Sequence, residues 1–291
     1  MKLVPPCGYA GGKRKWAADI AKILTSTKPD IIWDLFSGSG AITLELLSLG
    51  YAPTQLRMVE AGPWGAFYQA ASRGELDLDR IRSLLLDQMP KDAREVKRWV
   101  EDEIATLAPT PENFLIIQAA AYGAVPVWWD GVRWRRGDVG ANRGYSARSY
   151  WSPGPSSKEK NSRGTIFRPD KIVDTCEAIV RCTRGLKVYH DRIENIDLTK
   201  TEGSSVVYYA DPPYEGSTGY GHAPEQGVLE ALPRPLYVSE ASALPGGTWA
   251  HKLGAARGGA ISATSSRRNE WLTYFSTGAS NELLPHPYPR T

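Results

Sequence analysis

The stretch Ile-Ile-Trp-Asp-Leu-Phe-Ser-Gly-Ser-Gly at positions 31–40 reads as a buried strand that runs into a tight glycine turn. Residues 41–49 follow with the apolar spacing of a helix, and this order of elements is typical of a nucleotide-binding unit. Gly38 and Gly40 allow the backbone to approach a ligand closely. Position 43 is Thr where a dinucleotide fingerprint has its third glycine, and no Lys-Ser/Thr pair follows as in a phosphate-binding loop. The turn therefore favours a ligand that has a ribose but no phosphate, such as S-adenosylmethionine.

Two acidic residues lie where such a ligand needs them. Glu60 follows the next apolar run, residues 56–59, and a carboxylate after the second strand can bind ribose hydroxyls. Asp34 ends the first strand, where its carboxylate would meet the ammonium or aminoacyl group of the ligand. Because a single glycine turn is weak evidence, the functional prediction depends on further motifs.

A second motif, Tyr-Ala-Asp-Pro-Pro-Tyr at positions 209–214, directly follows the apolar run 206–208. Proline fixes φ and lacks an N–H, so the two prolines would end the strand stiffly and leave Asp211 and Tyr214 facing a crevice. An extruded base would stack on Tyr214, and its amino group would donate to Asp211 and to the carbonyl oxygen of Pro212. This geometry orients the nitrogen lone pair toward a methyl donor. Taken alone, the motif is equally compatible with a strand followed by a simple Pro-Pro turn.

In combination, these motifs resemble those of the DNA adenine-N6 methyltransferases, the family that includes GATC-specific bacterial enzymes and many phage enzymes. Tyr-Ala-Gly-Gly-Lys at 9–13 is similar to the family's N-terminal cofactor motif, which usually begins with Trp, and 34–40 is similar to its glycine-rich motif. Asp191 matches the acidic residue that contacts the cofactor adenine's amino group in the family. The family often has an Asn-Asp type pair after the second strand, whereas Glu60 is followed here by Ala-Gly-Pro.

The resemblance implies a Rossmann-like α/β sheet of the S-adenosylmethionine-dependent methyltransferase type with a mostly helical inserted target-recognition domain. Residues 1–60 and 165–291 would form the catalytic methyltransferase domain, and 61–164 the inserted DNA-binding region. The implied catalytic residues are Asp211, Pro212 and Tyr214, and the implied cofactor-binding residues are Tyr9, Ala10, Gly12, Lys13, Asp34, Phe36, Gly38, Gly40, Glu60 and Asp191.

The central insert has two parts. Residues 79–107 and 113–124 have helical apolar spacing, whereas 126–164 are rich in Gly, Arg, Trp and Ser. The second part contains eight basic and three acidic residues with interleaved aromatic rings, a composition that suits phosphate contacts and base stacking. A solvated basic loop is the alternative interpretation. The candidate DNA-binding residues are Arg133, Arg135, Arg136, Arg143 and Arg148.

Composition sets wider limits. The chain has 291 residues, of which 42% are hydrophobic, and a net charge of only +3, so DNA contacts would have to come from local clusters of basic residues. Three cysteines form no disulfide framework, no metal-ligand spacing is visible, and no apolar run approaches the length of a membrane span. We therefore expect a soluble, cytoplasmic protein of a prokaryotic or phage-infected cell, with no metal, no membrane contact and no obligatory protein partner.

These observations together predict direct methyl transfer from S-adenosylmethionine to the N6 amino group of adenine in double-stranded DNA after base flipping. Positioning by Asp211, rather than strong base catalysis, would dominate the reaction. Three alternatives stay open: cytosine-N4 methylation, which needs the same orientation of the lone pair; a protein that binds cofactor and DNA without turnover; and RNA as the substrate. We favour a stand-alone phage or host modification enzyme over one partner of a restriction-modification pair, and the target sequence cannot be read from the chain.

Overall fold

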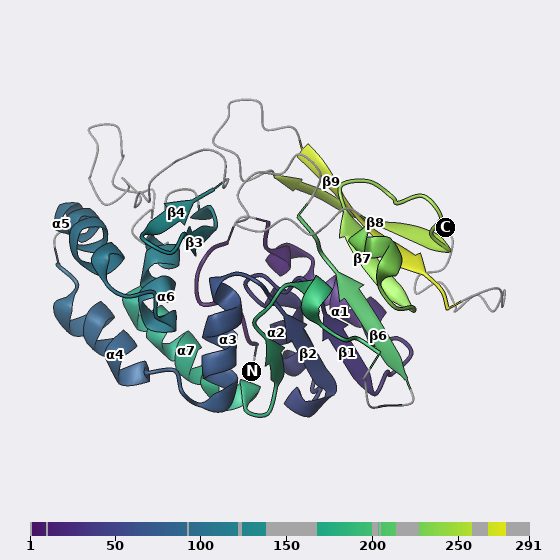
Figure 1. Ribbon diagram of the computed structural model, residues 1–291, viewed down its shortest axis with the longest axis horizontal. Helices are drawn as coiled ribbons and strands as arrows, with labels where there is room; N and C mark the ends of the chain where they lie inside the picture. The colour runs from purple at the N-terminus through teal and green to yellow at the C-terminus, as the bar shows by residue number, and fades with distance from the viewer. Residues whose placement is uncertain are drawn as a thin grey trace.

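The computed structural model describes residues 2–9, 11–91, 93–121, 124–137, 168–199, 203, 205–213, 227–257 and 267–277. Four residues with predicted roles lie outside this part of the chain, namely Ala10, Arg143, Arg148 and Tyr214. In the described part, a seven-stranded sheet forms the centre of the molecule, and helices pack around it (Figure 1).

The strand order in this sheet is β5-β2-β1-β6-β7-β9-β8. The first five strands of this order are parallel, β9 is antiparallel to β7, and β8 is antiparallel to β9. The mostly parallel sheet with its helices confirms the predicted α/β class and is compatible with a Rossmann-like fold. The strand bounds are β1 Ile31–Asp34, β2 Leu56–Val59, β5 Lys187–Tyr189, β6 Val206–Ala210, β7 Leu236–Glu240, β8 Trp249–Arg257 and β9 Arg267–Phe275.

The central strand β1 is buried along its whole length because both faces of the sheet are covered. Successive side chains of a strand point to opposite faces, and Ile32 accordingly joins one apolar cluster while Ile31 and Trp33 join another. The helices α1 (Ala17–Leu24) and α2 (Ala41–Ser48) contribute to the first cluster. The second cluster takes its covering side chains from the short helices η10 (Ile193–Asn195) and α8 (Val228–Ala231) and from nearby loops.

The helical part of the insert lies beside the sheet, and the small hairpin of β3 and β4 lies above it in Figure 1. Its side chains Ile81, Trp99 and Phe114 belong to the same apolar cluster as α1 and α2, so the insert shares its core with the sheet. None of the described helices is both long and apolar enough to cross a membrane. The elements of this region are α3 Pro63–Arg73, α4 Leu78–Arg82, the π-helical segments η3 Ser83–Gln88 and η4 Trp99–Glu103, α5 Ala93–Arg98, η5 Ile104–Thr106, α6 Pro111–Ala120, β3 Val127–Trp129, β4 Trp134–Arg136 and the returning helix α7 Pro169–Thr183.

The glycine turn between β1 and α2 requires glycine at Gly40. Its φ is 76°, and a Cβ at this position would lie 2.6 Å from the hydroxyl oxygen of Tyr68, which donates a hydrogen bond to the Ser39 carbonyl oxygen. We expect Gly40→Ala to lower the free energy of unfolding by about 2 kcal/mol or more, because it adds a steric clash to the cost of a left-handed backbone. Urea unfolding followed by circular dichroism measures this loss.

Gly50→Ala is the matched control. Gly50 also has a positive φ, 98°, but a Cβ there would meet no atom within 4 Å, so the conformational cost of about 1–2 kcal/mol stands alone. Equal losses in the two variants would show that contact with Tyr68 does not constrain the turn.

Candidate active site

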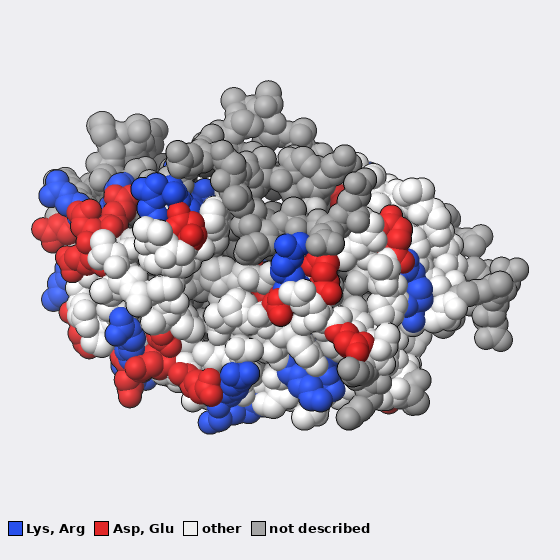
Figure 2. Space-filling view, viewed as in Figure 1, with Lys and Arg blue, Asp and Glu red and all other residues white. Residues whose placement is uncertain are grey.

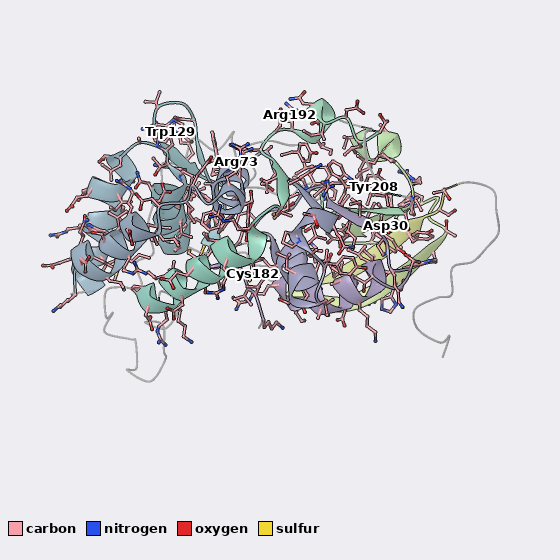
Figure 3. All side chains as sticks on the ribbon, turned by 90° about the horizontal axis from the view of Figure 1, so that it is seen from below. Asp30, Arg73, Trp129, Cys182, Arg192 and Tyr208 are labelled. Atoms are coloured by element: carbon pink, nitrogen blue, oxygen red, sulfur yellow. The ribbon has the colours of Figure 1, made fainter. Side chains whose placement is uncertain are left out.

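A pocket of about 290 Å³ lies at the carboxyl ends of β1, β2 and β6. Crevices at this edge of an open parallel sheet are the usual ligand sites of α/β proteins. Its lining comes from the N-terminal segment, the glycine turn, the segments after β2, β5 and β6, and the insert. Trp129 of the insert and Arg192 after β5 both line the pocket and lie along the upper edge of the molecule in Figure 3.

The glycine turn is tied to the end of β2. The Ser37 hydroxyl donates to the carbonyl oxygens of Asp34 and Val59 at 2.8 and 3.2 Å, and the Ser37 N–H also donates to Val59. Gly38 follows with a φ of 49°, so its N–H can turn toward Glu60. These bonds hold the glycine turn in the conformation in which it lines the pocket.

Both oxygens of Glu60 accept backbone hydrogen bonds, from the Gly38 N–H at 2.7 Å and from the Gly62 N–H at 2.8 Å. Burial raises the pKa of Glu60, and the two N–H donors oppose that shift. A carboxylate oxygen can accept more than one hydrogen bond, and Glu60 lines the pocket, so a ribose hydroxyl can still donate to it. Glu60, the residue predicted to bind ribose, therefore stabilises the glycine turn and can still accept a hydrogen bond from a ligand.

Asp34 is almost completely buried, with 2% of its surface exposed, and it lines the pocket. Its Oδ2 accepts a hydrogen bond from the Thr43 hydroxyl at 2.8 Å, whereas its Oδ1 has no hydrogen-bond partner among the described residues. Burial raises the pKa of Asp34 to about 7 despite the Thr43 bond. An acceptor left unpaired in this way is costly, and a cationic group bound in the pocket would satisfy it.

The N-terminal motif packs over the glycine turn. A Cβ at Gly38 would lie 3.2 Å from the Tyr9 ring, and the Tyr9 ring meets Trp64 edge-on at 6.2 Å between centroids. The Gly12 N–H donates to the Tyr9 carbonyl oxygen at 3.1 Å, which closes a tight turn before Lys13. Tyr9, Gly12 and the half-buried Phe36, three of the predicted cofactor-binding residues, all line the pocket.

Asp191 lies on the far wall of the pocket, in the loop after β5. Its Oδ1 accepts hydrogen bonds from the Asn195 side-chain amide at 2.8 Å and from the Arg192 N–H at 2.7 Å. These bonds, the Asn195 bond first, lower the pKa of Asp191. An exposed, ionised carboxylate at this position can accept from an amino group of a planar ring.

Asp211 follows β6 and faces a buried lysine. The Lys13 Nζ lies 2.6 Å from Asp211 Oδ1 and 3.5 Å from Glu270 Oε1, and the Lys13 and Glu270 side chains are each 7% exposed. Burial raises the pKa of Asp211 to about 7, the Lys13 charge lowers it, and Glu270 and then Glu240 raise it. The site therefore holds a carboxyl group that changes its charge near neutral pH.

The prolines behave as the sequence predicts at the backbone level, since β6 ends at Ala210. Pro212 is buried, and Pro213 lines the pocket beside Asp211. The aromatic member of the motif, Tyr214, is outside the described residues.

The basic insert contributes a hairpin whose tryptophans, Trp128, Trp129 and Trp134, line the pocket. Arg133 is exposed at the hairpin turn, and Arg135 pairs with Asp130 at 2.5 Å. The N–H groups of the turn and the Arg135 guanidinium lower the pKa of Asp130 to about 2. Arg136 is half-buried on β4. Figure 2 shows interspersed basic and acidic side chains on the described part of this face, not a continuous basic surface.

Sequence reasoning missed several residues in or next to the pocket. Thr43 and Glu270 contact the pocket residues Asp34 and Lys13, but neither belongs to a distinctive local motif, and each lies on a different element from its partner. His190, which directly follows β5, and residues 109–111, which lead into α6, also line the pocket. Within the described residues, no group of three or more His, Cys, Asp or Glu side chains is arranged to hold a metal ion.

Asp34→Asn tests the cost of the buried carboxyl group. The pKa of Asp34 is about 7 in the folded protein against an ordinary value of 3.8, so between about pH 4 and pH 7 the folded state retains a proton that the unfolded chain has lost. The contribution of Asp34 to the free energy of unfolding therefore falls as the pH rises from about 4 to about 7. Asn remains neutral, and we expect the variant to gain on the order of 2 kcal/mol at pH 8 and much less at pH 5.

Thermal unfolding at the two pH values measures the gain. Asp19→Asn removes an exposed carboxylate of α1 and controls for the loss of a negative charge as such. A gain for Asp34→Asn that is equal at pH 5 and pH 8 would contradict the assignment of a raised pKa.

Comparison with known proteins does not assign the chain to a family. Its sequence matches none of the protein-family descriptions against which it was compared, and no curated protein matches it at a significant level. The functional conclusion therefore depends on the geometry and chemistry of the pocket.

Proposed function

We propose that this protein is a site-specific DNA methyltransferase that transfers the methyl group of S-adenosylmethionine to the N6 amino group of adenine after base flipping. The observation that carries the proposal is the position of Asp211. This half-buried carboxyl group follows a central parallel strand and faces the same pocket as the glycine turn, Asp34 and Glu60. The pocket thus combines a nucleoside-type site with an acceptor for an amino group.

The residues of the pocket fit the cofactor. The unpaired Oδ1 of Asp34 is an acceptor for the ammonium group, Glu60 is an acceptor for ribose hydroxyls, and Asp191 is an acceptor for the adenine amino group. Tyr9 and Phe36 supply apolar surface beside the glycine turn. The bound cofactor supplies an electrophilic methyl group on a sulfonium ion.

The role of Asp211 in the reaction is to orient the target nitrogen. The adenine amino group is a poor nucleophile because its lone pair is delocalised into the ring. Hydrogen bonds to Asp211 and to the Pro212 carbonyl oxygen favour a pyramidal nitrogen whose lone pair faces the methyl donor. As the N–C bond forms and the C–S bond breaks, the nitrogen becomes acidic, and one of its protons leaves late toward Asp211 or water.

Two features outside the pocket support the proposal. The antiparallel pair β8 and β9 at one edge of a parallel sheet resembles the terminal hairpin of methyltransferase sheets. The hairpin of β3 and β4 carries Arg133 and Arg135 beside the pocket, where basic side chains can contact phosphates and adjacent aromatic rings can stack on bases.

Methyl transfer from labelled S-adenosylmethionine to unmethylated genomic DNA, followed by nucleoside digestion and mass spectrometry, tests the function. We expect N6-methyladenine from the unmutated protein. Asp211→Ala should lower kcat by about 10²–10⁴-fold, because it removes the group that orients the amino nitrogen. Asp197→Ala, at an exposed aspartate outside the pocket, is the control.

Other outcomes of the same assay have definite meanings. N4-methylcytosine would change the base assignment while keeping the mechanism. Cofactor binding without product on any DNA would contradict the proposal and favour RNA as substrate or a protein that binds without turnover.

Arg133→Ala tests the DNA-facing role of the hairpin. We expect weaker binding to double-stranded DNA and a decrease of about 1 in the slope of log K against log salt concentration, since one phosphate contact is lost. Arg82→Ala on α4 is the matched control, because Arg82 pairs with Glu177 away from the pocket. An unchanged slope for Arg133→Ala would show that Arg133 makes no phosphate contact.

A further inference from the structure

Lys13, near the N-terminus, is a buried cation between two carboxylates that come from the C-terminal third of the chain. Its Nζ lies 2.6 Å from Asp211 Oδ1 and 3.5 Å from Glu270 Oε1. All three side chains are largely removed from water, so their interactions are screened much less than those of a surface ion pair. Asp211 is thus the nearer partner of Lys13. Glu270 is a second acceptor, which the Lys13 ammonium can reach by a small movement of its own side chain.

Lys13 competes with the target base for Asp211. In the proposed reaction Asp211 accepts a hydrogen bond from the amino group of the base, while its Oδ1 already accepts one from the Lys13 ammonium, which withdraws negative charge from the same carboxylate. Leaving a buried ammonium without a partner would be costly, so displacement of Lys13 requires another acceptor. Glu270, which is only 5% exposed, is close enough to be that acceptor.

We propose that Glu270 is a positioning residue for the proposed methyl transfer: when the target amino group binds Asp211, the Lys13 ammonium shifts to Glu270. Because Lys13 stays paired throughout, Asp211 can exchange its partner without leaving a buried charge uncompensated. The shift is a rotation of the Lys13 side chain and involves no transfer of a proton from Lys13. Glu270 acts on the reaction through Lys13 and does not touch the substrate.

The electrostatic surroundings of Asp211 agree with this exchange. Glu270 and Glu240 both raise the pKa of Asp211, whereas Lys13 lowers it. Glu270 is in addition an ion-pair partner of the Lys13 ammonium, at 3.5 Å. The ionisable groups that face Asp211 are Lys13 on η1 (Lys13–Lys15), Asp34 on β1, Tyr209 on β6, Glu240 on β7 and Glu270 on β9.

A measurement that does not depend on turnover tests the second acceptor. Buried, hydrogen-bonded ammonium protons exchange slowly with water, so the Lys13 ammonium should give a ¹H–¹⁵N resonance that Lys13→Arg identifies by its absence. We expect this resonance to persist in Asp211→Ala, because Glu270 then holds Lys13, and to persist in Glu270→Ala. Its loss in Asp211→Ala, in a protein that still unfolds cooperatively, would overturn the proposal. The Lys13 ammonium protons of the double variant should exchange with water faster than those of either single variant.

The kinetic test uses a double-mutant cycle. Glu270→Gln should lower kcat by about 10-fold, within the range of coupling in one ion-pair network, because Lys13 then remains on Asp211. In a Lys13→Gln background the same change should have little further effect. Losses that multiply would show that Glu270 acts independently of Lys13 and would overturn the proposal.

The pH profile of kcat separates positioning from general electrostatics. Glu270→Gln and Glu240→Gln should both move the acidic limb to lower pH, since each removes a charge that raises the pKa of Asp211. Only Glu270→Gln should also lower the plateau, and an equal plateau loss in both variants would contradict the exchange. If the unmutated protein methylates no nucleic acid, the proposed function fails, and the resonance of Lys13 in Asp211→Ala alone decides whether Glu270 is its second partner.

Discussion

The parallel pairing of β1 with β2 on one side and β6 on the other is the constraint on which the candidate site depends. This register sets Asp34 opposite Met58 and Tyr209, so all three strands end at one edge of the sheet. Residues that follow them, including Glu60 and Asp211, are consequently brought to one pocket although they are far apart in the sequence. A shift of one residue in any of these strands would turn its side chains to the other face.

The site is costly to fold because it removes carboxyl groups from water. Asp34 is buried and Asp211 is half-buried, and the pKa of each is raised above that of an exposed aspartate. The fold offsets these costs with specific partners, the Thr43 hydroxyl for Asp34 and the Lys13 ammonium for Asp211. Within the described residues, the Oδ1 of Asp34 has no hydrogen-bond partner. This unpaired oxygen lowers the stability of the fold, and because Asp34 lines the pocket, a ligand that donates a hydrogen bond to it would recover that loss.

The sequence is informative where the structure is local and less so where it depends on distant contacts. The run 31–34 and the turn at Gly38 and Gly40 could be predicted, because strand burial and positive φ leave direct signals in residue type. The helix α3 was not predicted, although Pro63 at its first position and the spacing of its buried residues indicate it. The pairing of Lys13 with Glu270 left no signal, since the two residues meet only through the order of the strands.

The shared core also limits how this chain can change in evolution or in the laboratory. An aromatic series from Tyr9 of the N-terminal segment through Trp64 and Phe114 to Trp134 joins that segment to the hairpin, with ring centroids 6.2, 5.0 and 6.1 Å apart. A segment with its own core can be exchanged between relatives as a cassette, but this insert cannot, because its removal would take away the ring that packs against Tyr9 and part of the apolar cluster that it shares with α1 and α2. Changes to the surface beside the pocket would therefore have to arise by substitutions on the hairpin, beginning at exposed positions such as Val132, and not by replacement of the whole insert.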